Sequence, residues 1–200
     1  LTLLVAPNET IKTAPCPKLQ WLRWSGDTLC DEMLPCPTSD MPSLTSLVVS
    51  IHDIDPTFRF PQTLVSLVLD VGDGVVDVSQ LTPMTRLQRL TIKTYEDASP
   101  LDLSGLTTLT WLFSDRFLLS RLPTSLVKVR IVQVSDVDFS RCTSLTSLRI
   151  TMRRNVRVTF PTQLKKLHMR SGWPVNSNIG DVALEMLKSN EHTLTQDDVD

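Results

Sequence analysis

One short pattern recurs along this chain of 200 residues. Its clearest copies are LTSLVV at residues 44–49, LVSLVL at 64–69 and LTSLRI at 145–150. Apolar residues stand at the first, fourth and sixth positions, and the fourth and sixth alternate with the third and fifth as on a half-buried strand. Each segment is too short to be stable alone, which indicates that the segments stack and share one core.

The same pattern extends over most of the chain. Five further copies begin at Leu19, Leu87, Leu109, Leu126 and Leu164. The copies are separated by 25, 20, 23, 22, 17, 19 and 19 residues, and only one of them, with Ser114, lacks an aliphatic or aromatic sixth residue. The segment LTLLVA at residues 1–6 fits as a ninth copy that aligns Leu1 with Leu19. Such a recurring unit indicates a solenoid.

These L-x-x-L-x-L segments resemble the leucine-rich-repeat superfamily, and the resemblance covers residues 1–171. It implies a right-handed arc of eight or nine turns with short parallel strands on its concave face. The connections on the convex side would be 3₁₀ turns or helices. Units of 17 to 20 residues leave little room for a helix, so we expect 3₁₀ turns or extended segments. The fourth positions should form one buried row, made of Leu47, Leu67, Leu90, Leu112, Val129, Leu148 and Leu167.

Two kinds of unit are interleaved. In one, an apolar residue and a proline precede the strand, as in Phe60-Pro61, Leu122-Pro123 and Phe160-Pro161. In the other, an apolar residue stands between Asp and Ser, as in Asp77-Val78-Ser79, Asp102-Leu103-Ser104 and Asp138-Phe139-Ser140. We expect the apolar residue of both kinds to be buried one layer behind the strands, with the proline at a turn.

The sequence departs from the family in one respect. The family places Asn or Cys three residues after the sixth position, where this chain has His52, Gly72, Tyr95, Val134 and Arg153. The usual ladder of buried Asn side chains is therefore missing. We expect hydroxyls or turn backbone to satisfy the amides that this ladder would serve.

The repeats stop after residue 171. Residues 171–200 contain six acidic residues and one basic residue, Lys188, and the segment DVALEMLKSNEH at 181–192 has the spacing of a short amphipathic helix. Terminal repeats need a polar cover. We therefore predict two parts, repeats at 1–171 and a C-terminal cap with an acidic tail at 172–200.

The composition and the motifs restrict the function. A net charge of −2 and a mean hydropathy near zero favour neither nucleic acid nor a membrane surface. No apolar run approaches the roughly 20 residues that span a bilayer. The sequence has no phosphate-binding glycine loop, H-E-x-x-H or G-x-S-x-G motif, and His52, His168 and His192 lie in separate segments. We predict a non-catalytic protein without a cofactor or a metal site.

The cysteines favour a reducing compartment. Cys16, Cys30 and Cys36 lie within 21 residues, Cys142 is remote, and no pair has the C-x-x-C spacing of a zinc site. The first three also suggest the disulfide-rich cap of extracellular repeat proteins, but they lack its dense spacing. Reduced structural thiols are the preferred interpretation and a disulfide the alternative, so a cytoplasmic location is favoured over secretion.

Charge is distributed unevenly along the repeats. Residues 126–170 have ten basic and two acidic residues, a net charge of +8 in a chain of net −2. The second, third and fifth positions of each unit should line the concave face, and the last three units are basic there. The candidate partner-binding residues on the concave face are therefore Trp21, Arg23, Arg89, Trp111, Phe113, Lys128, Arg130, Arg149, Lys166 and His168.

Open solenoids offer a long surface, so we predict a module that binds a protein partner through its concave face. A partner with an acidic patch would complement the basic units, whereas the alternative for these charges is plain solvation of a strand surface. One alternative function is binding of nucleic acid or a phosphoinositide; nucleic acid is disfavoured because stacking aromatics are not interleaved with the cations. A second is a structural role within a longer repeat protein. A further alternative is internal, with the acidic tail folded over the basic units and neutralising their charge.

Overall fold

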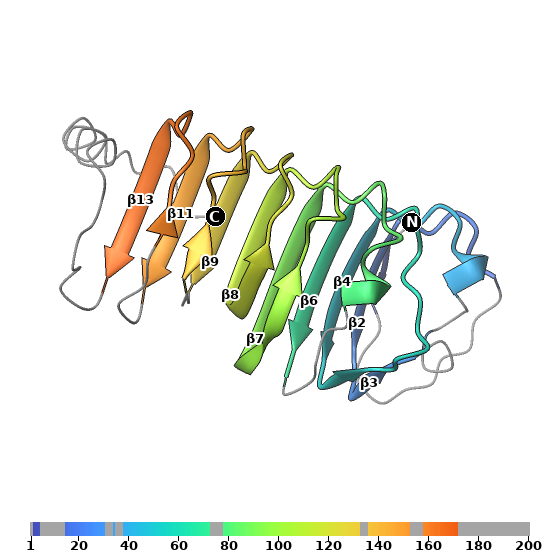
Figure 1. Ribbon diagram of the computed structural model, residues 1–200. Helices are drawn as coiled ribbons and strands as arrows, with labels where there is room; N and C mark the ends of the chain where they lie inside the picture. The colour runs from blue at the N-terminus through green and yellow to red at the C-terminus, as the bar shows by residue number, and fades with distance from the viewer. Residues whose placement is uncertain are drawn as a thin grey trace.

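The computed structural model describes residues 2–4, 15–30, 34, 38–72, 78–132, 136–152 and 158–171. Within these ranges the chain forms a parallel-strand solenoid, which confirms the predicted fold class. Figure 1 shows its strands side by side, with β2 towards one end and β13 at the other. The main sheet contains, in spatial order, β1 (Thr2–Leu4), β2 (Trp21–Ser25), β4 (Ser46–Ile51), β6 (Ser66–Val71), β7 (Arg89–Asp102), β8 (Trp111–Arg121), β9 (Lys128–Val132), β11 (Ser147–Met152) and β13 (Lys166–Ser171).

Within the described ranges the connections between these strands are extended or 3₁₀, as expected for units this short. Two small parallel sheets pair β3 (Thr28–Leu29) with β5 (Asp53–Ile54) and β10 (Val137–Asp138) with β12 (Val158–Thr159). The 3₁₀ turns are η1 (Thr38–Asp40) and η2 (Val78–Gln80). The described ranges contain no α-helix, so the alternative of helical connections is wrong there.

Residues at equivalent repeat positions stack in register. Leu22 pairs with Leu47, which pairs with Leu67, and this continuous row reaches Leu167. The predicted row of fourth positions is buried, since none of its members is more than 6% exposed. The first-position leucines are buried to the same degree, namely Leu19, Leu44, Leu64, Leu87, Leu109, Leu126, Leu145 and Leu164. The core therefore runs unbroken along the sheet.

Hydrogen bonds join adjacent turns where each strand begins. The amides of Thr45 and Ser46 both donate to the carbonyl of Gln20, at 3.0 Å, and every later unit repeats this arrangement. Hydroxyls strengthen the junction, because Thr63 donates to the Leu44 carbonyl at 2.6 Å. Equivalent side-chain bonds run from Thr108 to Leu87 and from Ser125 to Leu109, and the second-position Thr146 donates to the Val127 carbonyl.

Turn backbone replaces the missing Asn ladder at the other end of the strands. The amide of His52 donates to the Asp27 carbonyl at 2.9 Å, and the amide of Gly72 donates to the Ile51 carbonyl at 2.7 Å. The Thr94 hydroxyl in turn donates to the Gly72 carbonyl at 3.0 Å. This confirms the expectation at His52 and Gly72, while Val134, Arg153 and the side chain of Tyr95 lie outside the described residues.

Both kinds of repeat enter the strand through the same turn. The amide of the first leucine donates to the carbonyl three residues earlier, as from Leu64 to Pro61 (3.2 Å) and from Leu145 to Cys142 (3.0 Å). The turn itself needs only the carbonyl of the earlier residue, so proline, which has no amide hydrogen, is accepted there. Another residue at this place can also donate its amide, as from Cys142 to the Phe139 carbonyl at 2.9 Å. The prolines are therefore at the turn, as predicted, and they take the place that other repeats give to Cys16, Met41, Met84, Leu106 and Cys142.

The residues predicted to fill the convex side are buried to different extents. Leu103 and Phe139 are fully buried and Phe60 is 4% exposed, but Leu122 and Phe160 are only half-buried against the core. Burial was therefore overestimated for these two. Phe60 packs edge-to-face on Phe58, with ring centroids 5.0 Å apart, and the 17-residue unit that contains Leu122 has no equivalent ring. The side chain of Val78 lies outside the described residues.

The register predicted for the ninth copy was wrong by one residue. β1 pairs Thr2 with Trp21 and Leu3 with Leu22, whereas aligning Leu1 with Leu19 would have paired Leu3 with Trp21. A one-residue shift exchanges the two faces of a strand. Leu3 and Leu4 are both apolar, so the alternation of apolar and polar residues that fixes the register elsewhere is missing.

The buried row predicts a large cost for removing one member. Leu112 is fully buried and pairs in register with Leu90 and Val129. Leu112→Ala should lower the free energy of unfolding by about 2–5 kcal/mol, because it removes buried apolar surface and leaves a cavity. Urea denaturation measures this, with Arg89→Ala on the exposed side as the control, which should stay within about 0.5 kcal/mol of the wild type. Equal effects of the two changes would contradict the assigned core.

Replacement of the buried Ser114 should change the free energy of unfolding in the opposite direction. Its side chain is 1% exposed, its hydroxyl has no hydrogen-bond partner, and its register neighbours are Ile92 and Ile131. Ser114→Ala should raise the free energy of unfolding by about 1 kcal/mol, since burying an unpaired hydroxyl costs roughly 1–3 kcal/mol. Ser125→Ala is the matched control, because its hydroxyl donates to the Leu109 carbonyl and its loss should be destabilising. Destabilisation by Ser114→Ala would show that the hydroxyl is satisfied in solution.

Candidate functional site

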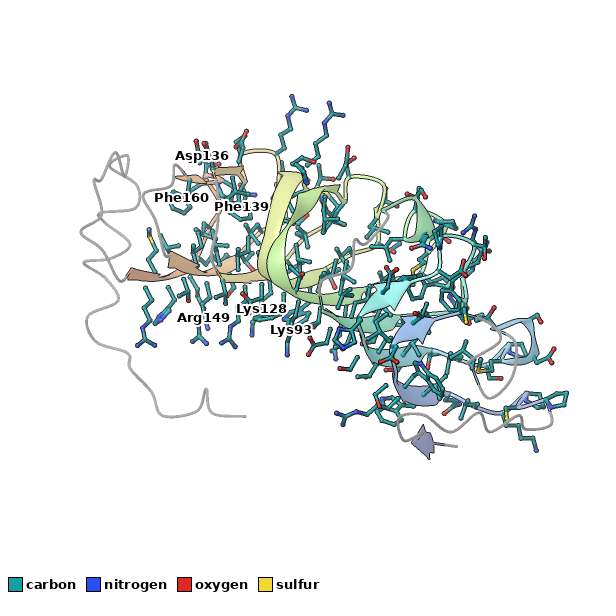
Figure 2. The ribbon with its side chains drawn as sticks, turned by 90° about the horizontal axis from the view of Figure 1, so that it is seen from below. Lys93, Lys128, Asp136, Phe139, Arg149 and Phe160 are labelled. Atoms are coloured by element: carbon teal, nitrogen blue, oxygen red, sulfur yellow. The ribbon has the colours of Figure 1, made fainter. Side chains whose placement is uncertain are left out.

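The main sheet has one face on the core and one face open to solvent. Side chains at the third, fifth and seventh repeat positions lie on the face that is open to solvent, which we call the open face. Figure 2 shows Lys93, Lys128 and Arg149 projecting on one side of the sheet and Phe139 and Phe160 on the other. The alternation along each strand, such as exposed Lys128 and Arg130 around buried Val129, produces this separation.

All ten predicted binding residues are on the open face. The third positions are Trp21, Arg89, Trp111, Lys128 and Lys166, and the fifth positions are Arg23, Phe113, Arg130, Arg149 and His168. Arg149 and the three aromatic residues of this set are half-buried, and the others are exposed. The structure therefore brings these residues onto one surface, and their part in binding stays a prediction.

The basic residues of the last strands occupy two neighbouring rows. Ser147 pairs in register with Lys128 on one side and with Lys166 on the other. Arg149 pairs in the same way with Arg130 and His168. Neighbouring parallel strands are about 4.8 Å apart, so the charges of Arg130 and Arg149 are one strand spacing apart and those of Lys128 and Lys166 are two. We call the five basic side chains Lys128, Arg130, Arg149, Lys166 and His168 the basic rows.

Two aromatic residues on β8 stand beside the basic rows. Trp111 pairs in register with Arg89 on β7 and Lys128 on β9, so a cation flanks it on both sides. Phe113 lies beneath two cations, because the guanidinium carbon of Arg130 is 5.3 Å and the ammonium of Lys93 is 6.0 Å from its ring centroid. A cation at this distance is attracted by the quadrupole of the ring. We call Trp111 and Phe113 the β8 aromatic pair.

The sequence interpretation missed the seventh positions. Lys93, Asp115 and Arg170 lie on the open face because their strands continue beyond the sixth position. Lys93 pairs in register with Asp70 and Asp115, and one carboxylate oxygen of Asp115 is buried without a hydrogen-bond partner. The sequence signal for these residues was a polar residue directly after the sixth position. This residue continues the alternation of buried and exposed side chains by one more step.

The buried thiol of Cys142 is not a nucleophile at neutral pH. Burial raises the pKa of Cys142 to about 11, and the nearby carboxylate of Asp138 adds to the rise. Since the thiolate is the reactive form, this side chain serves the core. Cys36 lies outside the described residues, so the interpretation of the first three cysteines as reduced thiols stays a prediction.

The Asp residues of the Asp-apolar-Ser units have a structural role. The Ser104 hydroxyl and amide both donate to Asp102, at 2.5 and 3.0 Å, and the Ser140 amide donates to Asp138 at 2.8 Å. These bonds lower the pKa of Asp102 and Asp138, and bonds from Thr57 lower the pKa of Asp55 in the same way. An ionised Asp that accepts from the residue two positions later closes a local turn.

The described ranges contain neither a candidate metal site nor a candidate membrane-spanning helix. No three His, Cys, Asp or Glu side chains there gather where they could hold a metal ion. No helix in those ranges has the length and the apolar composition needed to cross a membrane.

The sequence matches no family model and no curated protein. Among solved structures, the chain is similar to the functional domain of InlJ from Listeria monocytogenes, which includes a cysteine ladder. The two share 15% identity over 76% of this chain and 49% of that chain, with a TM-score of 0.34. This chain therefore spans about half the length of the InlJ chain.

The basic rows predict that salt stabilises the protein. Like charges on adjacent strands repel one another, and salt screens charges that are exposed to solvent. The unfolding temperature should rise between about 20 mM and about 300 mM NaCl, where the Debye length falls below about 10 Å. The rise should be smaller in Arg130→Gln/Arg149→Gln, which removes two like charges that are register partners on β9 and β11, whereas Arg23→Gln on β2 should keep it. Calorimetry at both salt concentrations measures this, and an equal rise in all three proteins would contradict repulsion within the rows.

Proposed function

We propose that the chain is a non-catalytic protein-interaction module of leucine-rich-repeat type that binds its partner through the open face. The repeat type is supported by the burial of the first and fourth positions and by the short, non-helical connections. The fold itself is a solenoid scaffold. Such scaffolds present an extended surface that each turn extends by one strand.

The observation that carries the proposal is the arrangement of charge and aromatic side chains on this face. Lys128 and Lys166 flank one hydroxyl, and Arg149 lies between Arg130 and His168. Folding gains nothing from placing like charges on adjacent strands, because such pairs are destabilising. An acidic partner gives the arrangement a use, since complementary potential speeds encounter and excludes wrong partners.

The aromatic residues favour a protein partner over nucleic acid or a phosphoinositide headgroup. Trp and Arg are the side chains that dominate protein interfaces when they lie together in a partly desolvated patch. Here Trp111 is half-buried between Arg89 and Lys128. A binder of single-stranded nucleic acid would interleave stacking aromatics with its cations, but the described open-face positions of β9, β11 and β13 carry neither Trp, Tyr nor Phe.

Charge reversal tests the proposal. A library of random peptides displayed on phage is selected against the intact chain and against Lys128→Glu/Arg130→Glu/Arg149→Glu/Lys166→Glu. The wild type should enrich acidic peptides and the variant should not, while its unfolding temperature stays within a few degrees of the wild type because these residues are surface groups. The matched control reverses four exposed cations outside the open face, in Lys18→Glu/Arg86→Glu/Arg121→Glu/Arg141→Glu, and should select the wild-type peptides.

Two different outcomes would contradict the proposed function. Selection of the same peptides by the wild type and the open-face variant would exclude this face as the binding surface. Absence of enriched peptides, together with heparin binding that falls steeply with salt, would favour the anionic-ligand alternative, because phosphate or sulfate contacts release counterions.

A further inference from the structure

We infer that the centre of the binding surface is the β8 aromatic pair, and that it accepts one apolar side chain of an extended peptide with acidic residues on both sides. This inference rests on the proposed function and names the chemistry of the partner. It combines three features of the open face: the position of Trp111, the two cations over Phe113, and the spacing of the flanking charges.

Trp111 occupies a position that, apart from Trp21 on β2, the other repeats give to small or charged side chains. Its equivalents on β4, β6 and β11 are Ser46, Ser66 and Ser147. A serine therefore satisfies the fold at this position, and the indole is not needed for packing between strands. A half-exposed Trp next to Phe113 offers apolar area to another side chain, and such aromatic contacts contribute about 0.5–1.5 kcal/mol beyond burial.

The two cations over Phe113 are held near the positions that a carboxylate partner would use. Lys93 comes from β7 and Arg130 from β9, so they reach the ring from the two neighbouring strands. Contact with the ring restricts both long side chains before any partner binds. Less rotamer entropy is then lost when each head pairs with an anion, which is the general benefit of preorganisation.

The spacing of the charges fits an extended peptide. Arg89 and Lys128 are two strands apart with Trp111 between them in register. Two strand spacings are about 9.6 Å. In an extended chain every second side chain lies on the same face, so two acidic residues four positions apart would face the sheet about 13 Å from each other. One would face the β7 cations Arg89 and Lys93 and the other the β9 cations Lys128 and Arg130, whose long side chains cover the difference, and the apolar residue midway between them would lie over the β8 aromatic pair.

A phosphate polymer fits this centre less well. It carries no apolar side chain for Trp111 and Phe113, and its negative charges would be served by the basic rows alone. Asp115 on the same strand also adds a negative charge next to Lys93 in register. The centre on β8 therefore favours a peptide with few charges and one apolar anchor.

Three peptides test the inference by titration of the intact ¹⁵N-labelled chain in two-dimensional NMR. The first is Ser-Glu-Ser-Phe-Ser-Glu-Ser; the second replaces Phe by Ala, and the third replaces both Glu by Lys. The Phe peptide should bind about fivefold tighter than the Ala peptide, in the range expected for one aromatic contact. Its largest shift changes should lie on β7, β8 and β9, and the Lys peptide should not bind.

Two variants with a matched control locate the contact. Trp111→Ser takes the residue of the equivalent repeats, and Phe113→Thr takes the Thr91 of the neighbouring strand. Both should abolish the preference for Phe over Ala while the acidic peptides still bind, and the spectrum of each variant reports whether it is folded. Trp21→Ser changes the same residue type at the same repeat position on β2 and should keep the preference.

The outcomes separate this inference from the proposed function. Equal affinity for the Phe and Ala peptides, or equal loss in Trp21→Ser and Trp111→Ser, would overturn the β8 centre and leave a uniformly charged binding face. Binding of neither acidic peptide, together with polyphosphate binding on β9, β11 and β13, would overturn the proposed protein-binding function as well.

Discussion

The parallel stacking of identical repeat positions is the constraint on which the rest of the molecule depends. Each strand buries its fourth-position side chain against the same position of its two neighbours, and the amides at the strand entrance bond to the preceding turn. Because no strand is stable alone, each turn completes the one before it. The same register that builds the core sets every open-face side chain next to its equivalents, so the core and the candidate binding surface have one origin.

Much of this arrangement could be predicted from the repeat length and from the alternation of apolar and polar residues along each strand. The spacing of the leucines predicted the buried rows, and alternation then assigned Lys128, Arg149 and the other candidates to the opposite face. The prediction failed where alternation was absent, at Leu3 and Leu4, and where a second ring was needed for burial, at Leu122. The two cations over Phe113 were not predicted as a pair, because Arg130 shares the fifth position with Phe113 whereas Lys93 reaches the ring from the seventh position of β7.

The two repeat types illustrate how different sequences meet one physical requirement. The turn before each strand needs a carbonyl three residues ahead of the leucine, which Pro61 and Cys142 supply equally well. The Asp-apolar-Ser units instead fix the convex side with bonds between an Asp and the Ser two residues later. Hence the motifs that precede the strands shape turns, whereas the open face carries the aromatic and cationic groups suited to a partner.

The register of the main sheet is tested most directly by cysteine crosslinking. Ser46 and Ser66 are partners on the adjacent strands β4 and β6, whereas Ser46 and Ser147 are on distant strands. Under mild oxidation, followed by peptide mapping, Ser46→Cys/Ser66→Cys should form the engineered disulfide, since partner residues on adjacent strands lie about 4.8 Å apart. Ser46→Cys/Ser147→Cys should stay reduced at these two positions. Equal crosslinking of both pairs, or of the distant pair alone, would contradict the stacked register and the surface built on it.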